Sequence, residues 1–368
     1  MNILIYVPAG HHRSPDQQAQ AELLISLGHK VILLSLSPEG VLHDNFRSLG
    51  ASAFSSSHKK GTSIFFFVRQ VVYLIQFCRK QKIDFIFSHL QTNALIAGVA
   101  TKFLVSKSIY FRHNADYYYL KKNKKGILIN SLANKVSQNI IAISENVKTE
   151  LFKENVSPKR ITRINLCYNF EKYLLLEEKG QSENIKRRSG ADFILLCIAR
   201  LDELKRHLLA FKTIQKLNMD GYNCSLVCIG EGDNRSGLEK WIKDNNMTNK
   251  IFLDGLVSNV ADYILATNIQ LLLSYSEASN QAVKEGAFFN KTAIVCKNVG
   301  DFEDYIIDGV NGYFVNKENP INDSVQIIKK VMKNTEKLGI AGVKLHKAVI
   351  NKFSINAVRG QYITLLKK

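Results

Sequence analysis

The chain has 368 residues, 46% of them hydrophobic, so it can bury more than one core, and its length predicts two domains. Its formal net charge is +18. No segment reaches the roughly 20 consecutive apolar residues of a membrane-spanning helix, and MNILIYV lacks the basic head and cleavage site of a secretory signal, so we expect a globular cytoplasmic protein.

The first half alternates short apolar segments with helical patterns. Residues 3–7 (ILIYV) predict a strand, and residues 17–28 (QQAQAELLISLG) predict a helix that ends at Gly28. The other strands expected in this half are 31–37, 84–90, 108–113 and 139–144. Such alternation predicts an α/β fold with a parallel sheet covered by helices on both faces, and ligands bind these sheets beyond the carboxyl ends of the strands.

The pattern lapses at residues 169–190, which are polar and charged. We therefore expect a linker at 171–190, between a first domain at 1–170 and a second at 191–350. The strands expected in the second domain are 193–199, 225–230, 251–255, 269–274, 292–297 and 312–315. They predict a second parallel sheet. The helical segment 351–368 is able to pack on its own domain or to cross back to the first, and the sequence does not decide between them.

Two cations follow the strand expected at 193–199. Arg200 lies in the loop after this strand, and Lys205 lies near the start of the next helix. Cations beside the N–H groups of a helix N-terminus make a site for phosphate. The alternative is that both are ordinary surface charges.

The strand at 225–230 ends in Gly230 and Gly232, which would let a ligand approach the backbone. The next glycine is Gly237, so the dinucleotide-binding spacing G-x-G-x-x-G is not met, and the chain has no G-x-x-x-x-G-K-[ST] segment. These absences disfavour a nicotinamide dehydrogenase and a P-loop nucleotidase. The six cysteines lie mostly in apolar segments, which suits buried thiols rather than a metal site.

The stretch SYSEASNQAVKEG, residues 274–286, carries two acids, Glu277 and Glu285. We expect Glu277 in a loop at the carboxyl end of a strand and Glu285 in the following helix, with Ser279 or Asn280 as its N-cap. This arrangement suits a sugar nucleotide. One carboxylate would accept hydrogen bonds from the ribose hydroxyls, and the other would lie near the sugar. The loop amides and the two cations Arg200 and Lys205 would bind the diphosphate. The alternative is that both acids are ordinary surface residues.

Taken in order, these segments resemble the GT-B retaining glycosyltransferases of the large E-x(7)-E family (glycosyl transferases group 1, or family 4, type). The pieces that carry the resemblance are Arg200-Leu201 with Lys205, residues 229–232, residues 252–257, Glu277 with Glu285, residues 300–304 and residues 308–312. MNILIYVPAG, IFSHL, IYFRHN, IIAIS and KRITRINLCYNF fit the family's first domain more loosely. The resemblance implies two Rossmann-like parallel-sheet domains that face each other across a cleft, with the acceptor on the first and the sugar nucleotide on the second.

The resemblance also implies a role for each candidate residue. The catalytic candidates are Glu277, His113, Arg200 and Lys205. The donor-binding candidates are Glu285, Ser279, Asn280, Gln281, Gly230, Gly232, Leu256 and Val257. The acceptor-side candidates are Gly10, His11 and His89. Because Arg200 and Lys205 would neutralise the leaving diphosphate, neither a metal nor a cofactor is expected, and for His113 a purely structural role is the alternative.

The function implied is transfer of a hexose, with retention, from a UDP- or GDP-sugar to a glycan or polyprenyl-linked oligosaccharide. The expected setting is bacterial cell-surface polysaccharide synthesis, whether of capsule, O-antigen or exopolysaccharide. The sequence departs from the family at Ala278, where glycine is common, and at residues 286–292. A non-catalytic sugar-nucleotide-binding module and a sugar-nucleotide epimerase on the same fold therefore stay as alternatives. The donor base, donor sugar, acceptor and linkage stay open.

Positive charge is concentrated at residues 51–125, which contain 13 basic residues and two acids, Asp84 and Asp116, together with FFF, YYY and KKNKK. Basic residues mixed with aromatic ones suit an anionic membrane surface or a nucleic acid, and a solvated basic face is the alternative. A helix expected at 64–80 is either buried or lies on a membrane. We expect peripheral attachment to the inner face of the cell membrane, and no nucleic acid.

Overall fold

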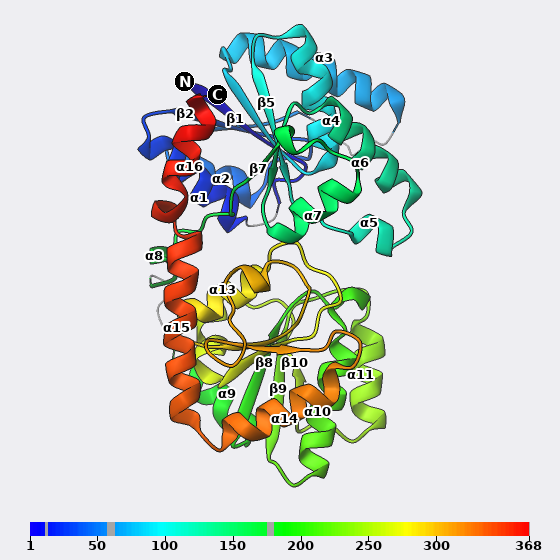
Figure 1. Cartoon of the computed structure of the whole chain (residues 1–368), viewed down its shortest axis with the longest axis vertical. Helices are drawn as coiled ribbons and strands as arrows, with labels where there is room; N and C mark the ends of the chain where they lie inside the picture. The colour runs from blue at the N-terminus through cyan, green and yellow to red at the C-terminus, as the bar shows by residue number, and fades with distance from the viewer. Residues whose placement is uncertain (12–13, 57–62, 175–179, 368) are drawn as a thin grey trace. The chain divides into compact units, whose positions relative to one another are not determined.

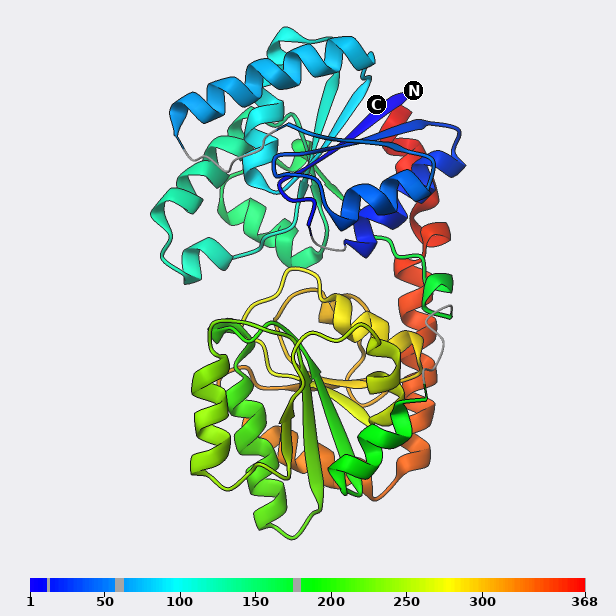
Figure 2. The same cartoon turned by 180° about the vertical axis from the view of Figure 1, so that it is seen from behind.

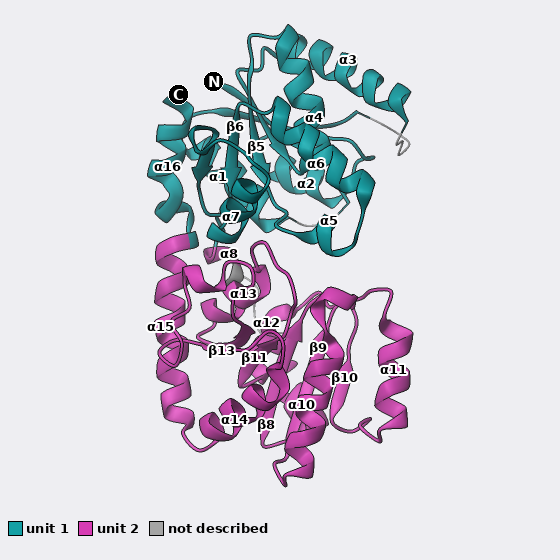
Figure 3. Cartoon of the chain, turned by 45° about the vertical axis from the view of Figure 1, so that its right-hand side comes forward, with its two compact units in different colours: residues 1–169, 353–368 teal, residues 170–352 magenta. Residues whose placement is uncertain are grey.

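The computed structural model describes residues 1–11, 14–56, 63–174 and 180–367. The chain forms two compact units, which Figure 3 colours separately: unit 1 is Met1–Asn169 with Phe353–Lys368, and unit 2 is Phe170–Lys352. Three parts of the expectations above lie outside the described residues. They are residues 12–13 of the first loop, 57–62 of the basic segment and 175–179 of the expected linker.

Unit 1 contains a seven-stranded sheet in the order β3-β2-β1-β4-β5-β6-β7. The strands are β1 (Asn2–Val7), β2 (Lys30–Ser35), β3 (Ser52–Ser55), β4 (Phe85–His89), β5 (Lys107–Arg112), β6 (Asn139–Ala142) and β7 (Ile161–Arg163). All neighbouring pairs are parallel, which confirms the predicted sheet. The two edge strands, β3 and β7, were not expected from the sequence.

Helices cover both faces of this sheet (Figure 1; the opposite side is seen in Figure 2). They are α1 (Pro15–Ser26), α2 (Val41–Ser48), α3 (Ile64–Gln81), α4 (Gln91–Ala100), α5 (Tyr117–Leu120), α6 (Lys124–Val136), α7 (Glu145–Lys153) and α16 (Ile355–Lys367). Successive side chains of a strand point to opposite faces. Ile3 and Ile5 of β1 accordingly pack with residues of α1, α2 and α16, whereas Leu4 and Tyr6 pack with α3 and α4.

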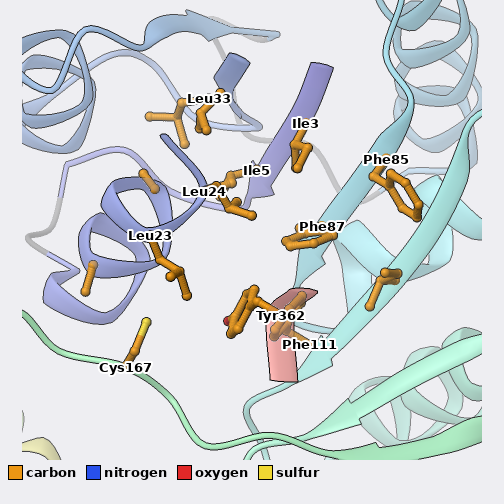
Figure 4. Close-up of a cluster of buried hydrophobic side chains, with 14 of the residues drawn as sticks. Ile3, Ile5, Leu23, Leu24, Leu33, Phe85, Phe87, Phe111, Cys167 and Tyr362 are labelled. Atoms are coloured by element: carbon orange, nitrogen blue, oxygen red, sulfur yellow. The ribbon is translucent and has the colours of Figure 1, made fainter. Parts of the chain in front are cut away.

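The C-terminal helix α16 is part of the core of unit 1. Figure 4 shows Tyr362 beside Phe87 and Phe111, and the ring centroids of Tyr362 and Phe111 lie 6.3 Å apart. Val358, Tyr362 and Leu365 are buried in the same cluster. The structure thereby answers a question that the sequence left open.

Unit 2 contains a six-stranded sheet in the order β10-β9-β8-β11-β12-β13, again with every neighbouring pair parallel. The strands are β8 (Phe193–Ile198), β9 (Cys224–Ile229), β10 (Ile251–Leu253), β11 (Ile269–Leu272), β12 (Ala293–Cys296) and β13 (Tyr313–Val315). Each begins within one residue of a predicted strand. The second parallel sheet, and with it the predicted α/β class, is confirmed.

The helices of unit 2 include two inside the expected linker, α8 and α9. They are α8 (Glu171–Leu174), α9 (Ser182–Ser189), α10 (His207–Met219), α11 (Arg235–Asp244), α12 (Val260–Ala266), α13 (Gln281–Phe288), α14 (Pro320–Met332) and α15 (Thr335–Phe353). Ile185 of α9 is buried with Ile194 and Ile264, so α9 belongs to the core of unit 2 although its sequence is mostly polar. The reason is that this short helix needs only one apolar side chain to dock.

Candidate active site

An ion pair joins two loops of unit 2 that leave the carboxyl ends of neighbouring strands. The strands are β8, which leads to Lys205, and β11, which leads to Glu277. Lys205 Nζ donates to Glu277 Oε1 at 2.6 Å, and the two side chains are only 16% and 8% exposed. A largely buried ammonium and carboxylate thus meet where parallel α/β sheets bind ligands. The structure brings together these two candidates.

Local hydrogen bonds position Lys205. It ends a single 3-10 turn, Glu203–Lys205, whose N-cap Asp202 accepts from the Lys205 N–H at 3.2 Å. The next residue, Arg206, is left-handed, with φ 51°, and its guanidinium donates to Leu273 O at 2.7 Å and to Lys317 O at 2.8 Å. Arg206 therefore ties the loop after β8 to the end of β11. Sequence reasoning missed this arginine, because spacing alone does not distinguish it from a surface cation.

Arg200 lies outside the Lys205–Glu277 pair. Its guanidinium contacts Asp202 Oδ2 at 3.0 Å, and its side chain is 69% exposed. An exposed ion pair of this kind is worth little in stability. Arg200 is therefore a cation beside the loop rather than a part of its framework.

The helix α13 begins next to Glu277. Of the two N-caps expected, Ser279 and Asn280, the structure shows Asn280, whose Oδ1 accepts from the Val283 N–H at 2.9 Å. The amide of the same side chain donates to Glu277 Oε1 at 3.1 Å. One turn further on, Gln281 Nε2 donates to Glu285 Oε1 at 2.6 Å. The first acid is thus bound to the cap and the second to the first residue of the helix.

Two side chains that sequence reasoning missed lie under the same loop. Ser279 Oγ donates to Asp301 Oδ2 at 2.7 Å, and the Asn280 N–H donates to Asp301 Oδ1 at 3.1 Å. Lys284 completes the group, with Nζ 2.5 Å from Asp301 Oδ2. A lysine inside the helix at this position reads in sequence as a solvated charge, so no signal pointed to it.

The glycines after β9 lie against the backbone of a neighbouring loop. A Cβ on Gly230 would lie 2.1 Å from Ala199 O, and one on Gly232 would lie 2.5 Å from Leu201 O. The side of each glycine on which a Cβ would stand is filled by the backbone of the loop that carries Arg200. These glycines thus allow that loop to pack, and their contact with the donor stays a prediction.

Leu256 and Val257 line a cavity of about 430 Å³ in unit 2. Leu256 is 82% exposed, whereas Val257 packs against the core. The remaining lining is rich in hydrogen-bonding side chains, among them Gln181, Asn184 and Asn259.

The candidates of unit 1 form a separate group. His113 Nε2 lies 2.8 Å from His89 Nδ1, and His89 Nε2 lies 2.9 Å from Gln20 Oε1. Gln20 in turn donates to the Tyr362 hydroxyl at 2.8 Å. Burial lowers the pKa of both histidines, and the neighbouring His113 lowers that of His89 further. Both rings are therefore neutral at pH 7, and they form a chain of hydrogen bonds.

The loop that follows β5 is held by Arg112, which sequence reasoning also missed. Its Nε donates to Asn114 O at 2.7 Å, and its two terminal nitrogens bind the Glu154 carboxylate at 2.8 and 2.9 Å. The pair is almost fully buried. Arg112 thereby fixes the backbone on either side of His113.

The acceptor-side candidates of the first loop differ in burial. The Gly10 N–H donates to Ser37 Oγ at 2.8 Å, and Gly10 O accepts from the Leu42 N–H at 2.9 Å, so Gly10 is part of the framework. His11 is exposed. Within the described residues, no group of three or more His, Cys, Asp or Glu side chains is arranged to hold a metal ion.

Two family models match the chain, one in each half. The model described as Glycosyltransferase Family 4 matches residues 18–172, and the model described as Glycosyl transferases group 1 matches residues 179–343. Both are glycosyltransferase models, and the chain has the GT-B fold. The two parallel-sheet units are the two Rossmann-like domains of this class, so the predicted fold and the transferase class are confirmed.

Relatives and solved structures agree with this assignment. The glycosyltransferase is 26% identical to the uncharacterized glycosyltransferase MJ1178 of Methanocaldococcus jannaschii over 69% of this chain and 67% of the relative, and 25% identical to MJ1069 of the same organism over 69% and 68%. Among solved structures, Anabaena Alr3699/HepE in complex with UDP matches with a TM-score of 0.83 and 13% identity, covering all of both chains. A glycosyltransferase from Rickettsia africae matches with a TM-score of 0.79 and 18% identity over 100% of this chain and 97% of that one. At these identities the structures support the fold alone.

Proposed function

We propose that this glycosyltransferase moves a hexose, with retention of anomeric configuration, from a nucleoside diphosphate sugar to a glycan or lipid-linked acceptor. The observation that carries the proposal is the Lys205–Glu277 pair of 2.6 Å beside the N-terminus of α13. The pair supplies a cation and a carboxylate, and the start of α13 supplies oriented N–H groups in the same loop region of unit 2. A donor with a negative diphosphate and a sugar rich in hydroxyl groups needs these three kinds of partner.

The chemistry explains why cations are needed there. As the bond to the anomeric carbon breaks, the carbon becomes cation-like and the diphosphate gains negative charge. Donors that are already aimed at the developing charge are usually the largest catalytic contribution. We assign this role to Lys205, to Arg200 and to the first N–H groups of α13. We propose that Glu277 contacts the donor sugar. Glu285 would accept from the ribose hydroxyls once Gln281 releases it.

Two observations support a nucleotide donor. Alr3699/HepE has been solved with UDP and with UDP-glucose, on a fold that matches this chain. In this chain, the cavity behind Leu256 and Val257 is lined by amide side chains that suit the edge of a nucleobase. We propose that it receives the base of a UDP- or GDP-sugar.

For the acceptor we propose a cell-surface glycan or a lipid-linked precursor. The matching structures include a lipopolysaccharide outer core galactosyltransferase, WaaB, and a TarM variant in complex with a glycosylated glycerol. The acceptor would be held by unit 1, where His113 offers its ring Nδ1 to a hydroxyl group. Attachment to an anionic membrane through the basic, aromatic part of unit 1 would bring the enzyme to such an acceptor.

The test is a comparison of Arg200→Ala, Lys205→Met and the control Lys240→Met in a transfer assay. A thermal-shift screen with UDP, GDP, ADP and their sugar conjugates first identifies the donor. We expect each of the first two variants to lose about 10²- to 10³-fold in turnover, because each removes one positive charge that would stabilise the leaving diphosphate. Lys240 is 77% exposed and pairs with Asp244 on α11, so its loss should leave turnover unchanged. Turnover of Lys205→Met close to that of the control would refute the proposal.

A binding module without turnover is the second candidate, because Arg200 is bound to Asp202 and Ala278 stands where glycine is common. It requires tight nucleotide-sugar binding with neither transfer nor hydrolysis. Detection of a glycosylated product would exclude it, and the anomeric coupling constant of that product would show whether configuration is retained.

A further inference from the structure

A fully buried ion pair lies beneath the loop between Glu277 and α13. Lys284 Nζ and Asp301 Oδ2 are 2.5 Å apart, and both side chains are 0% exposed. Charged side chains are almost never fully buried unless they are paired. Burial lowers the pKa of Lys284, and Asp301 opposes this by favouring the ammonium form.

Both charges bind the same two loop residues. Asp301 accepts from the Asn280 N–H at 3.1 Å and from Ser279 Oγ at 2.7 Å. Lys284 donates to Asn280 O at 2.8 Å and to Ser279 Oγ at 3.0 Å. The pair thus holds the backbone of Asn280 on both sides and the side chain of Ser279. The loop cannot shift without breaking hydrogen bonds to buried charges.

The pair is a costly way to stabilise a fold. Taking two charges out of water costs free energy that their attraction only partly returns, and apolar replacements of a buried pair are often neutral or stabilising. A hydrophobic contact between α13 and the segment after Gly300 would serve folding equally well. What an apolar contact does not supply is a set of directed hydrogen bonds to Ser279 and Asn280.

Those bonds control the N-terminus of α13. The first N–H groups of a helix have no acceptor within the helix. Here the Asn280 N–H binds Asp301 and the Val283 N–H binds the Asn280 cap. The N–H groups of Gln281 and Ala282 lie between them, and their direction follows from the position of Asn280. The same residue also donates to Glu277.

We propose that Lys284 and Asp301 are positioning residues, which fix Ser279 and Asn280 so that Glu277 and the N–H groups of Gln281 and Ala282 meet the donor already oriented. This inference rests on the proposed function, because it assigns those groups to the donor. A loop that is ordered before binding loses less conformational freedom when the ligand arrives, and this raises affinity.

The experiment compares two double variants, Lys284→Met/Asp301→Leu and Lys284→Met/Asp301→Asn. Neither leaves a lone buried charge, so both should keep the Tm of the wild type within a few degrees. The leucine variant has no acceptor for the Asn280 N–H. The asparagine variant keeps an oxygen where Oδ1 accepts this N–H. We expect the Kd for UDP or GDP, whichever the wild type binds, to rise about tenfold or more in the leucine variant, which corresponds to a loss of one hydrogen-bonded constraint. The asparagine variant should recover most of the affinity.

The outcomes separate the two levels of the proposal. If the wild type binds neither nucleotide, the proposed function fails and this inference fails with it. If the wild type binds and the leucine and asparagine variants bind equally well, the positioning role alone is refuted. If the leucine variant does not fold, the asparagine variant is compared with the single variant Asp301→Asn, in which Lys284 keeps its charge. If the one of these two variants with the lower Tm also binds the nucleotide more weakly, the role is merely structural and the inference is overturned. If affinity is retained although Tm is lowered, the inference is supported.

Discussion

The side-chain amide of Gln20 determines the tautomers of two histidines, His89 and His113. Gln20 Oε1 only accepts hydrogen bonds, so His89 Nε2 carries the hydrogen and His89 Nδ1 is left as an acceptor. His113 Nε2 must then donate to His89, which leaves His113 Nδ1 with a free lone pair in the neutral ring. His113 is thereby able to accept a hydrogen bond at one defined atom, whereas burial disfavours its protonation.

The buried His89 predicts a pH dependence of stability. Its pKa in the folded protein lies well below the ordinary value of 6.5, so the unfolded chain binds a proton near pH 6.5 while the folded chain does not. The unfolding free energy should therefore fall as pH decreases from 7.5 to 5, by up to about 1.4 kcal/mol per pH unit for this one group. In His89→Gln this contribution is absent, and urea denaturation at several pH values should show a shallower dependence. Parallel curves for the two proteins would contradict the prediction.

The candidate site was only partly visible in the sequence at the level of residues. Glu277 and the Asn280 cap were identified because a strand, a loop and a helix follow one another in a recognisable order. Lys284, Asp301 and Arg206 were not, because a charge that is buried in the fold looks the same in sequence as one that is solvated. Only the tertiary structure shows which polar side chains have been taken out of water.

In unit 1, the central strands could be predicted and the two edge strands could not, whereas in unit 2 the edge strands β10 and β13 were predicted as well. β3 (SAFS) and β7 (ITR) are the outermost strands of unit 1, and they have four and three residues. An edge strand is paired on one side only and is often short and polar, which guards against association. Such a strand lacks the apolar run by which β1, β4 and β5 were recognised. The omission thus follows from the short, partly polar sequences of β3 and β7, since the edge strands β10 (IFL) and β13 (YFV) of unit 2 are apolar and were predicted.

Helix α3 leaves one apolar face uncovered. Val71, Leu74, Phe77 and Cys78 are buried in the core of unit 1, whereas Phe65 and Val68 are 85% and 52% exposed, and Figure 3 shows α3 at the surface of this unit. In the part of the chain that the structure describes, no helix is long and apolar enough to cross a bilayer. An uncovered apolar face on a basic unit is typical of a helix that lies on a membrane.

We expect the protein to co-sediment at low salt with vesicles that contain phosphatidylglycerol, and much less with vesicles of phosphatidylcholine. Phe65→Ser/Val68→Ser should weaken this binding, because two apolar side chains no longer enter the lipid. The matched control is Ile340→Ser/Val343→Ser, which changes two exposed apolar residues of α15. Wild-type protein that stays in the supernatant with anionic vesicles would refute membrane attachment, and equal loss in both variants would remove α3 as its cause.

In the whole molecule, the chain returns to its first unit at the end. The helical pattern of 351–368 told us that this segment has an apolar face but not which core receives it, because periodicity carries no information about the partner. The structure assigns it to unit 1, where Tyr362 is 1% exposed among Phe87 and Phe111. The predicted pair of parallel sheets was correct, whereas this connection required coordinates.

Tyr362→Ala should therefore destabilise unit 1 by about 3–5 kcal/mol, as expected when a buried aromatic ring is removed and a cavity remains. Tyr362→Phe keeps the ring and loses only the hydrogen bond from Gln20, so it should cost about 1 kcal/mol. Denaturation followed by circular dichroism measures both. The only tryptophan, Trp241 in α11, reports on unit 2 by its fluorescence. An alanine variant no less stable than the phenylalanine variant would show that α16 is dispensable to the core.

The position of α16 also sets the order of events on the ribosome. Domains generally fold as they emerge, with the N-terminal one first. Here the first 169 residues emerge without Val358, Tyr362 and Leu365, which reach the exit tunnel only after all of unit 2 has been translated. The half that is made first is thus the half that is finished last, because Phe87 and Phe111 lack their contact with Tyr362 until α16 has been translated.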